Sequence, residues 1–178
     1  MAEIIHLESV RLRQAANRGF KNWARHFSDK LDETTRIVDL SDETLAFLVS
    51  PEEQRIFLLY DFIMGVRQLG KGSDFFSLDK TTKMEVVDVS IFLLDQLRFE
   101  CMHRLRWLVA SETQRLPIVQ LASQYESRPK GRRPAVPELH PSHPRYYEFR
   151  SLTEFEREPF IRRMIPAAVQ QFISRVSG

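Results

Sequence analysis

Cysteine is almost absent from this chain of 178 residues, which contains only Cys101. A single cysteine excludes an internal disulfide and is typical of proteins in a reducing compartment. Long apolar runs are also missing, because no stretch approaches the roughly 18 residues that a membrane-spanning helix needs. Residues 1–8 lack the profile of a signal peptide. We therefore expect a cytoplasmic protein without a membrane partner, and we expect Cys101 to be a small core residue.

The sequence also lacks every motif that would specify a reaction. No Ser/His/Asp set, glycine-rich phosphate loop or zinc-binding pattern can be assembled from its residues. We therefore interpret the chain as non-enzymatic, and we expect no catalytic residue, metal or cofactor.

Short histidine patterns leave a carboxylate-bundle metalloprotein as an alternative. Glu100 and His103 have the Glu-x-x-His spacing of metal sites in helical bundles. The same spacing occurs at Glu3 and His6, near one end of the chain. Such a site needs carboxylates from two further helices, so we favour a simple ion pair between Glu100 and Arg104, four residues apart.

A second histidine pair lies in a proline-rich stretch, where His140 and His143 flank Pro141 and Ser142. Two ligands do not complete a metal site, and no cysteine is near. We interpret these histidines as part of a solvated loop.

What the sequence does contain is a long helical pattern at about 79–110. Glycine and proline are absent from this stretch, and its apolar residues recur at helical spacing over about half of the circumference. Residues 87–91 alternate as a strand would, but helical spacing returns from Phe92 onward. Asp79 is suited to the N-cap. The pattern predicts one long central helix, and we expect neighbouring residues to cover most of its surface.

Its polar strip carries Asp88, Asp95 and Arg106. Paired carboxylates can perform acid–base chemistry. More often they hold arginines of a neighbouring helix, and we favour such a structural ion network. The arginines considered as its partners are Arg11, Arg13, Arg18 and Arg67.

Further helices are predicted at 7–30, at 51–69 and after Pro117. For the second of these, Ser50, Pro51 and Glu53 form the strongest start signal in the chain, and Gly70 is suited to the left-handed position after its end. Together these patterns predict an all-α fold, an irregular bundle of five or six helices.

The amino-acid composition changes after residue 127. Residues 128–150 are rich in proline and predict an extended crossing segment, the strap or linker of the molecule. We divide the chain into a helical core at 1–127, this strap, and short C-terminal helices at 151–178 that pack on the core or on a partner subunit. A capping box at Ser151–Glu154 begins the last part, and its two prolines predict two or three short segments with kinks. The strap prolines are Pro129, Pro134, Pro137, Pro141 and Pro144.

Cations and tyrosines alternate along the strap. Such a mixture suits contact with phosphates and stacking on bases, so binding of nucleic acid or another polyanion is one alternative function. The same segment could instead dock on a neighbouring subunit. The candidate binding residues are Arg128, Lys130, Arg132, Arg133, Arg145, Tyr146, Tyr147 and Arg150.

Charge is divided unevenly along the chain. Residues 1–97 carry 12 Lys and Arg against 16 Asp and Glu, whereas residues 98–178 carry 14 against 8. The two parts can attract each other within one molecule or between molecules. We predict a non-enzymatic helical interaction or scaffold protein that self-associates, with a protein partner or a second copy as its ligand.

Overall fold

The computed structural model describes residues 2–125 and 136–178, with side chains described from residue 7 onward. The described part is helical, and its only β contacts are two isolated bridges. Six of its α-helices have seven residues or more, which confirms the predicted all-α irregular bundle. The α-helices are α1 (Ala2–Gly19), α2 (Trp23–His26), α3 (Asp42–Val49), α4 (Glu53–Val66), α5 (Lys80–Arg104), α6 (Ile118–Gln124), α7 (Tyr146–Ser151) and α8 (Glu154–Ser177). Three 3₁₀ helices are η1 (Ile37–Asp39), η2 (Gly72–Ser77) and η3 (Glu112–Arg115).

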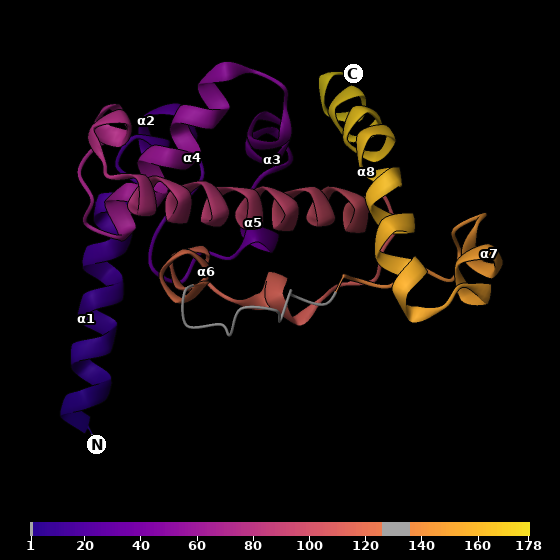
Figure 1. Ribbon diagram of the computed structural model, residues 1–178, viewed down its shortest axis with the longest axis horizontal. Coiled ribbons are helices and arrows are strands. Elements are labelled where there is room, and N and C mark those ends of the chain that lie inside the picture. Colours follow the sequence, from indigo (N-terminus) through magenta and orange to yellow (C-terminus); the bar gives the residue numbers. More distant parts are fainter. Residues whose placement is uncertain (1, 126–135) are drawn as a thin grey trace.

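Helix α5 crosses the middle of the molecule, as Figure 1 shows, and the other elements are arranged around it. Asp79 is its N-cap, and the Asp79 carboxylate accepts the Thr82 amide hydrogen at 3.1 Å. Residues 87–91 are helical, so the strand-like alternation there does not produce a strand. The C-terminal half of the helix is almost wholly buried, but Met84 and Ile91 are each 55% exposed in the N-terminal half. The predicted cover is therefore incomplete.

Two helix ends differ from the prediction for the same reason. Helix α5 ends at Arg104 rather than near residue 110, because Arg106 adopts a left-handed φ of 62° and reverses the chain. Helix α4 ends at Val66 rather than Leu69, with Gln68 at φ 58° in the position predicted for Gly70.

Each of these ends is a complete Schellman motif. The Trp107 amide donates to the Met102 carbonyl at 2.8 Å, and the Leu69 amide donates to the Met64 carbonyl at 2.9 Å. A non-glycine residue in this conformation gives no sequence signal, so the helices were predicted too long.

Two other helix boundaries also differ from the predicted ones. The predicted helix at 7–30 is two helices, α1 and α2, separated by a turn at residues 20–22. Helix α4 begins at Glu53, because the Ser50 hydroxyl donates to the Phe47 carbonyl at 2.8 Å and closes α3 instead of starting α4.

The C-terminal region is not a series of short helices. Helix α8 is continuous over 24 residues, with Pro159 and Pro166 inside it. Both prolines are exposed, so water can hydrate the carbonyl that each leaves without a helical partner. The opposite side of the helix is a buried apolar stripe that includes Ile161, Ala168 and Phe172. Burial of this stripe stabilises the continuous helix by more than the two prolines destabilise it. The capping box at its start pairs Thr153 with Glu156 rather than involving Ser151.

Buried side chains form two clusters. The larger one, here the main core, is built by α1–α6 and takes Phe172 from α8. Phe20, Trp23 and Phe62 meet at its centre, with the Trp23 and Phe62 rings 4.9 Å apart.

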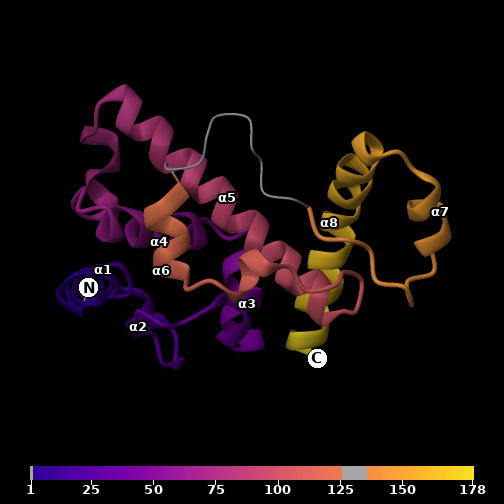
Figure 2. The same cartoon turned by 90° about the horizontal axis from the view of Figure 1, so that it is seen from below.

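The smaller cluster is the core of a C-terminal lobe, which we define as residues 136–165. Its buried side chains include Phe149, Phe160 and Ile161, together with Phe99 and Met102 from α5. Figure 2 shows α7 on the outer side of α8 at this end of the molecule. Within the predicted strap, residues 136–140 are held to the loop after α5, because the Val109 amide donates to the Glu138 carbonyl at 3.0 Å and the His140 amide to the Trp107 carbonyl at 2.7 Å.

Candidate functional site

The structure locates only half of the residues proposed to bind a polyanion. Arg128, Lys130, Arg132 and Arg133 lie outside the described residues. The other four, Arg145, Tyr146, Tyr147 and Arg150, lie on or next to α7 at the surface of the C-terminal lobe.

The two arginines of this group differ in their surroundings. Arg145 pairs with Glu148 through two hydrogen bonds of 2.7 Å, and its guanidinium lies 4.5 Å from the centre of the Phe160 ring. The hydrogen bonds that Arg145 donates to Glu148 raise the pKa of Arg145 and lower the pKa of Glu148. Arg145 thus has a partner of opposite charge within the lobe. Arg150 lies over the Tyr146 ring, 6.0 Å from its centre, and forms no ion pair with a side chain in the described part of the chain.

The lobe also exposes two large aromatic side chains. Phe155, in the first turn of α8, is 90% exposed, and Tyr147 on α7 is 85% exposed. These are the highest values among the large hydrophobic residues of the described part. A single exposed apolar residue is common, but two aromatic rings left in water on one small lobe make this lobe a candidate contact region.

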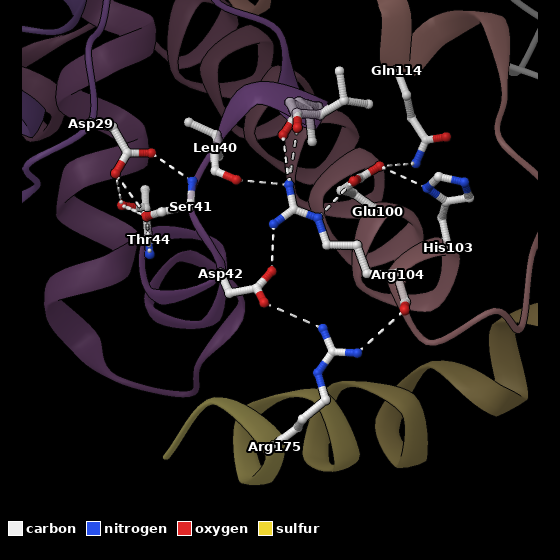
Figure 3. Close-up of polar contacts among 12 residues, drawn as sticks. Asp29, Leu40, Ser41, Asp42, Thr44, Glu100, His103, Arg104, Gln114 and Arg175 are labelled. Atoms are coloured by element: carbon white, nitrogen blue, oxygen red, sulfur yellow. Dashed lines mark hydrogen bonds and ion pairs between the residues drawn. The ribbon is translucent and has the colours of Figure 1, made fainter. Parts of the chain in front are cut away.

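A different polar constellation is buried between α3, α5 and α8. The guanidinium of Arg104, the last residue of α5, donates to Glu100 at 2.8 Å, to Asp42 at 2.7 Å and to the Leu40 carbonyl at 2.8 Å, as Figure 3 shows. The exposed fraction of Glu100 is 2%, and its second oxygen accepts from Gln114 at 3.1 Å. We call Glu100, Arg104, Asp42, Gln114 and Arg175 the arginine hub.

Arg175 of α8 completes the hub at its outer edge. It donates to Asp42 at 3.4 Å and to the Arg104 carbonyl at 3.3 Å, which caps the end of α5. Burial disfavours the charge of Arg104, but the hydrogen bonds that it donates to Glu100 and Asp42 outweigh this effect and raise its pKa. Each charged side chain of the hub has a partner of opposite charge, so the hub joins α3, α5 and α8. The predicted pair between Glu100 and Arg104 is confirmed.

Asp29 anchors the N-terminus of α3 beside the hub. Its carboxylate accepts the Ser41 amide hydrogen at 2.7 Å and the Ser41 and Thr44 hydroxyl hydrogens at 2.7 and 2.8 Å. Burial raises the pKa of Asp29, but these hydrogen bonds have the larger combined effect and lower it.

The ion network predicted for the polar strip of α5 exists in part. Asp95 is buried and accepts from Arg162 of α8 at 2.8 Å, so a neighbouring helix does supply the arginine. The partner is not one of the four arginines considered from the sequence. Two of those four, Arg18 and Arg67, donate to backbone carbonyls instead.

The candidate metal ligands do not come together in the part of the chain that the structure describes, where no group of three or more His, Cys, Asp or Glu side chains is placed to hold a metal ion. His103 lies 3.5 Å from Glu100. The Nδ1 atoms of His140 and His143 instead accept the amide hydrogens of Ser142 and Arg145, both at 3.1 Å. The side chains of Glu3 and His6 are outside the described set.

Cys101 is fully buried, as predicted, and burial raises the pKa of its thiol to about 12. A thiol with this pKa stays protonated at neutral pH and is a poor nucleophile.

The structure also gathers cations that the sequence reasoning did not single out. Arg18, Lys21, Arg25 and Lys71 line one cleft where α1, α2 and α4 meet. A signal was present, because residues 18, 21 and 25 have the spacing of one helix face. Lys71 comes from a different part of the chain, and only the fold brings it to the others.

No helix in the described ranges has the length and apolar character needed to cross a membrane. No protein-family model matches the chain, and neither curated proteins nor solved structures provide a match.

Proposed function

We propose that this chain is a non-enzymatic, cytoplasmic helical interaction protein that self-associates through its C-terminal lobe. The observation that carries the proposal is the exposure of Phe155 and Tyr147. Burying an aromatic side chain of this size against a partner is worth about 2 kcal/mol, which makes such residues effective anchors of an interface.

The charges around these rings favour a second copy over an unrelated partner. Phe155 is flanked in sequence by Glu154 and Glu156, and α7 carries Arg150. A two-fold interface brings the same region of both molecules together, so a lobe that carries both signs of charge can pair with itself.

The division of charge along the chain gives less support. Asp42 pairs with Arg104 and Arg175, and Asp95 pairs with Arg162. These acids of the first half and arginines of the second half already attract each other within one molecule, which was one of the alternatives considered above.

The test is the oligomeric state of the full chain, measured by light scattering during gel filtration over a range of concentrations. We expect a dimer that dissociates in the Phe155→Ser and Tyr147→Ser variants. Phe76→Ser is the matched control, because Phe76 is 76% exposed but lies on η2, outside the lobe. A monomer at every concentration, or equal dissociation in the control, contradicts the proposal.

Binding of a polyanion through the strap is the alternative function. Arg150, beside the tyrosines of α7, is the described residue that supports it. Retention on heparin that falls with salt and is lost in an Arg132→Glu, Arg133→Glu variant is the expected result. Retention equal to that of the wild type in this variant contradicts this alternative.

A further inference from the structure

The cleft lined by Arg18, Lys21, Arg25 and Lys71 has a volume of about 550 Å³. This volume is within the range of small-molecule sites, about 300–1,000 Å³. The four cations come from the end of α1, the turn before α2, α2 itself and the loop after α4. One carboxylate, that of Asp61, lines the same cleft.

Local structure brings the walls of the cleft close together. Helices α1 and α4 cross at Gly19 and Gly65, and a Cβ atom on Gly65 would lie 2.7 Å from the Arg18 carbonyl oxygen. Gln68 and Gly70, with φ values of 58° and 103°, then turn the chain so that Lys71 reaches the cleft. Met64, which is fully buried, also lines the cleft.

The oxygens in the walls of the cleft already accept hydrogen bonds from protein donors, and Asp61 supplies the cleft's single negative charge. Asp61 accepts the Gly72 amide hydrogen at 2.7 Å with one oxygen and an Asn22 amide hydrogen with the other. The Gly65 carbonyl accepts from Arg18 Nε at 2.9 Å, and the Leu69 amide donates to the Met64 carbonyl. Another carboxylate, Asp74, accepts the Lys71 amide hydrogen at 2.8 Å and is not among the residues that line the cleft.

Donor groups of the four cations have no acidic partner within the described residues. The bond from Nε to Gly65 fixes the Arg18 guanidinium and leaves its two terminal nitrogens without a partner among the described residues. Lys21, Arg25 and Lys71 form no side-chain ion pair within residues 2–125 and 136–178. A fixed arginine fork is well suited to phosphate oxygens, and lysines add positive charge around them.

We infer that this cleft is a binding site for a small molecule that carries a diphosphate group. Four cations against one engaged carboxylate favour a densely charged anion over a single carboxylate or a neutral ligand. The source of the diphosphate is either a nucleoside diphosphate or an inorganic diphosphate, and both have the same charged group.

Isothermal titration of the full chain with inorganic pyrophosphate and, separately, with ADP tests the inference. We expect one site per chain, and chemical-shift changes at the amides of Gly65, Gly70 and Lys71 in a two-dimensional NMR spectrum. If the affinity for ADP exceeds that for pyrophosphate by at least about tenfold, the ligand class is a nucleoside diphosphate. If the two affinities are equal, the site recognises the diphosphate group alone.

Variants at exposed positions locate the binding without disturbing the fold. Lys71→Gln and Arg25→Gln each remove one charge-assisted contact, so we expect about tenfold weaker binding. Lys80→Gln and Arg163→Gln are the matched controls, because both residues are exposed and neither lines the cleft. No binding of either ligand by the wild type at moderate salt overturns the inference. Equal weakening in the controls, or shift changes away from the cleft, also overturns it.

Discussion

The main core and the core of the C-terminal lobe bury aromatic rings in different ways. In the main core, Trp23 packs against Phe20 and Phe62, and its indole donates to the Leu58 carbonyl at 2.9 Å. In the lobe, arginines cover the rings, with Arg145 over Phe160 and Arg157 over Phe149 at 4.5 and 5.2 Å.

The two regions therefore differ in how fully their aromatic rings are covered within one molecule. Phe20, Trp23 and Phe62 of the main core are enclosed by other apolar groups, whereas its peripheral ring, Phe172, has Arg175 of the arginine hub 5.1 Å from its centre. In the lobe, long charged side chains shield the rings from water, and Phe155 has no such cover. Exposed aromatic surface is where a partner gains most, so the proposed self-association predicts that variants in the lobe change the oligomeric state and that variants in the main core change stability.

The largest expected effect is at the centre of the main core. Phe62→Ala removes a fully buried ring that packs against Phe20 and Trp23. We expect the free energy of unfolding to fall by about 4 kcal/mol, because such truncations also leave a cavity. Urea denaturation followed by tryptophan fluorescence measures this change. A loss below about 1 kcal/mol would mean that the main core is not the stable part of the molecule.

Arginine forms buried ion pairs in the arginine hub and covers aromatic rings in the lobe, and a methionine substitution in each region distinguishes these two roles. Arg104→Met leaves Glu100 and Asp42 without their main partner, and we expect a loss of about 3 kcal/mol in the free energy of unfolding. Arg157→Met keeps apolar cover over Phe149 and removes a buried Nε that has no hydrogen-bond partner within the described residues. We expect a change within about 1 kcal/mol. If urea denaturation shows the same loss in the free energy of unfolding for both variants, the two arginines do not differ in role.

A smaller effect is expected at the start of α8. Thr153→Ala removes the hydroxyl that contacts Glu156 at 2.9 Å, and we expect a loss of about 1 kcal/mol. Because this cap belongs to the lobe, hydrogen exchange should accelerate in α7 and the first half of α8. Ser73→Ala, at an exposed site on η2, is the control. Equal acceleration in α1 and α4 would show that the two regions unfold together.

The smallest effect concerns pH. Folding lowers the pKa of Asp29 below its ordinary value of 3.8, so its ionised form stabilises the fold above this pH. The contribution is lost as pH falls through the lower, folded-state value. In the Asp29→Asn variant, we expect the free energy of unfolding to fall less as the pH is lowered than it does in the wild type. Urea denaturation at several pH values measures this change. Asp88→Asn, at an exposed carboxylate, should leave this fall unchanged.

The sequence predicted some parts of the site and missed others for identifiable reasons. The pair between Glu100 and Arg104 was predictable, because residues four apart on a helix are neighbours. The pairing of Asp95 with Arg162 was not, since 67 residues separate them and local spacing carries no information about it. Exposure of Phe155 was equally hidden, because an apolar residue in the first turn of a helix has the same sequence pattern whether or not another element covers it.

By itself, the sequence determined the fold class, the central helix with its Asp79 cap, and the burial of Cys101. These depend on spacing and on contacts within a few residues. Only the tertiary structure decided where α4 and α5 end, that α8 continues through two prolines, and that Lys71 joins Arg18 at one cleft. The two helix ends depend on non-glycine residues in the left-handed conformation, which give no sequence signal. The continuity of α8 and the position of Lys71 depend on packing between segments far apart in the chain, where the free energy of burial exceeds the local preferences that a sequence displays.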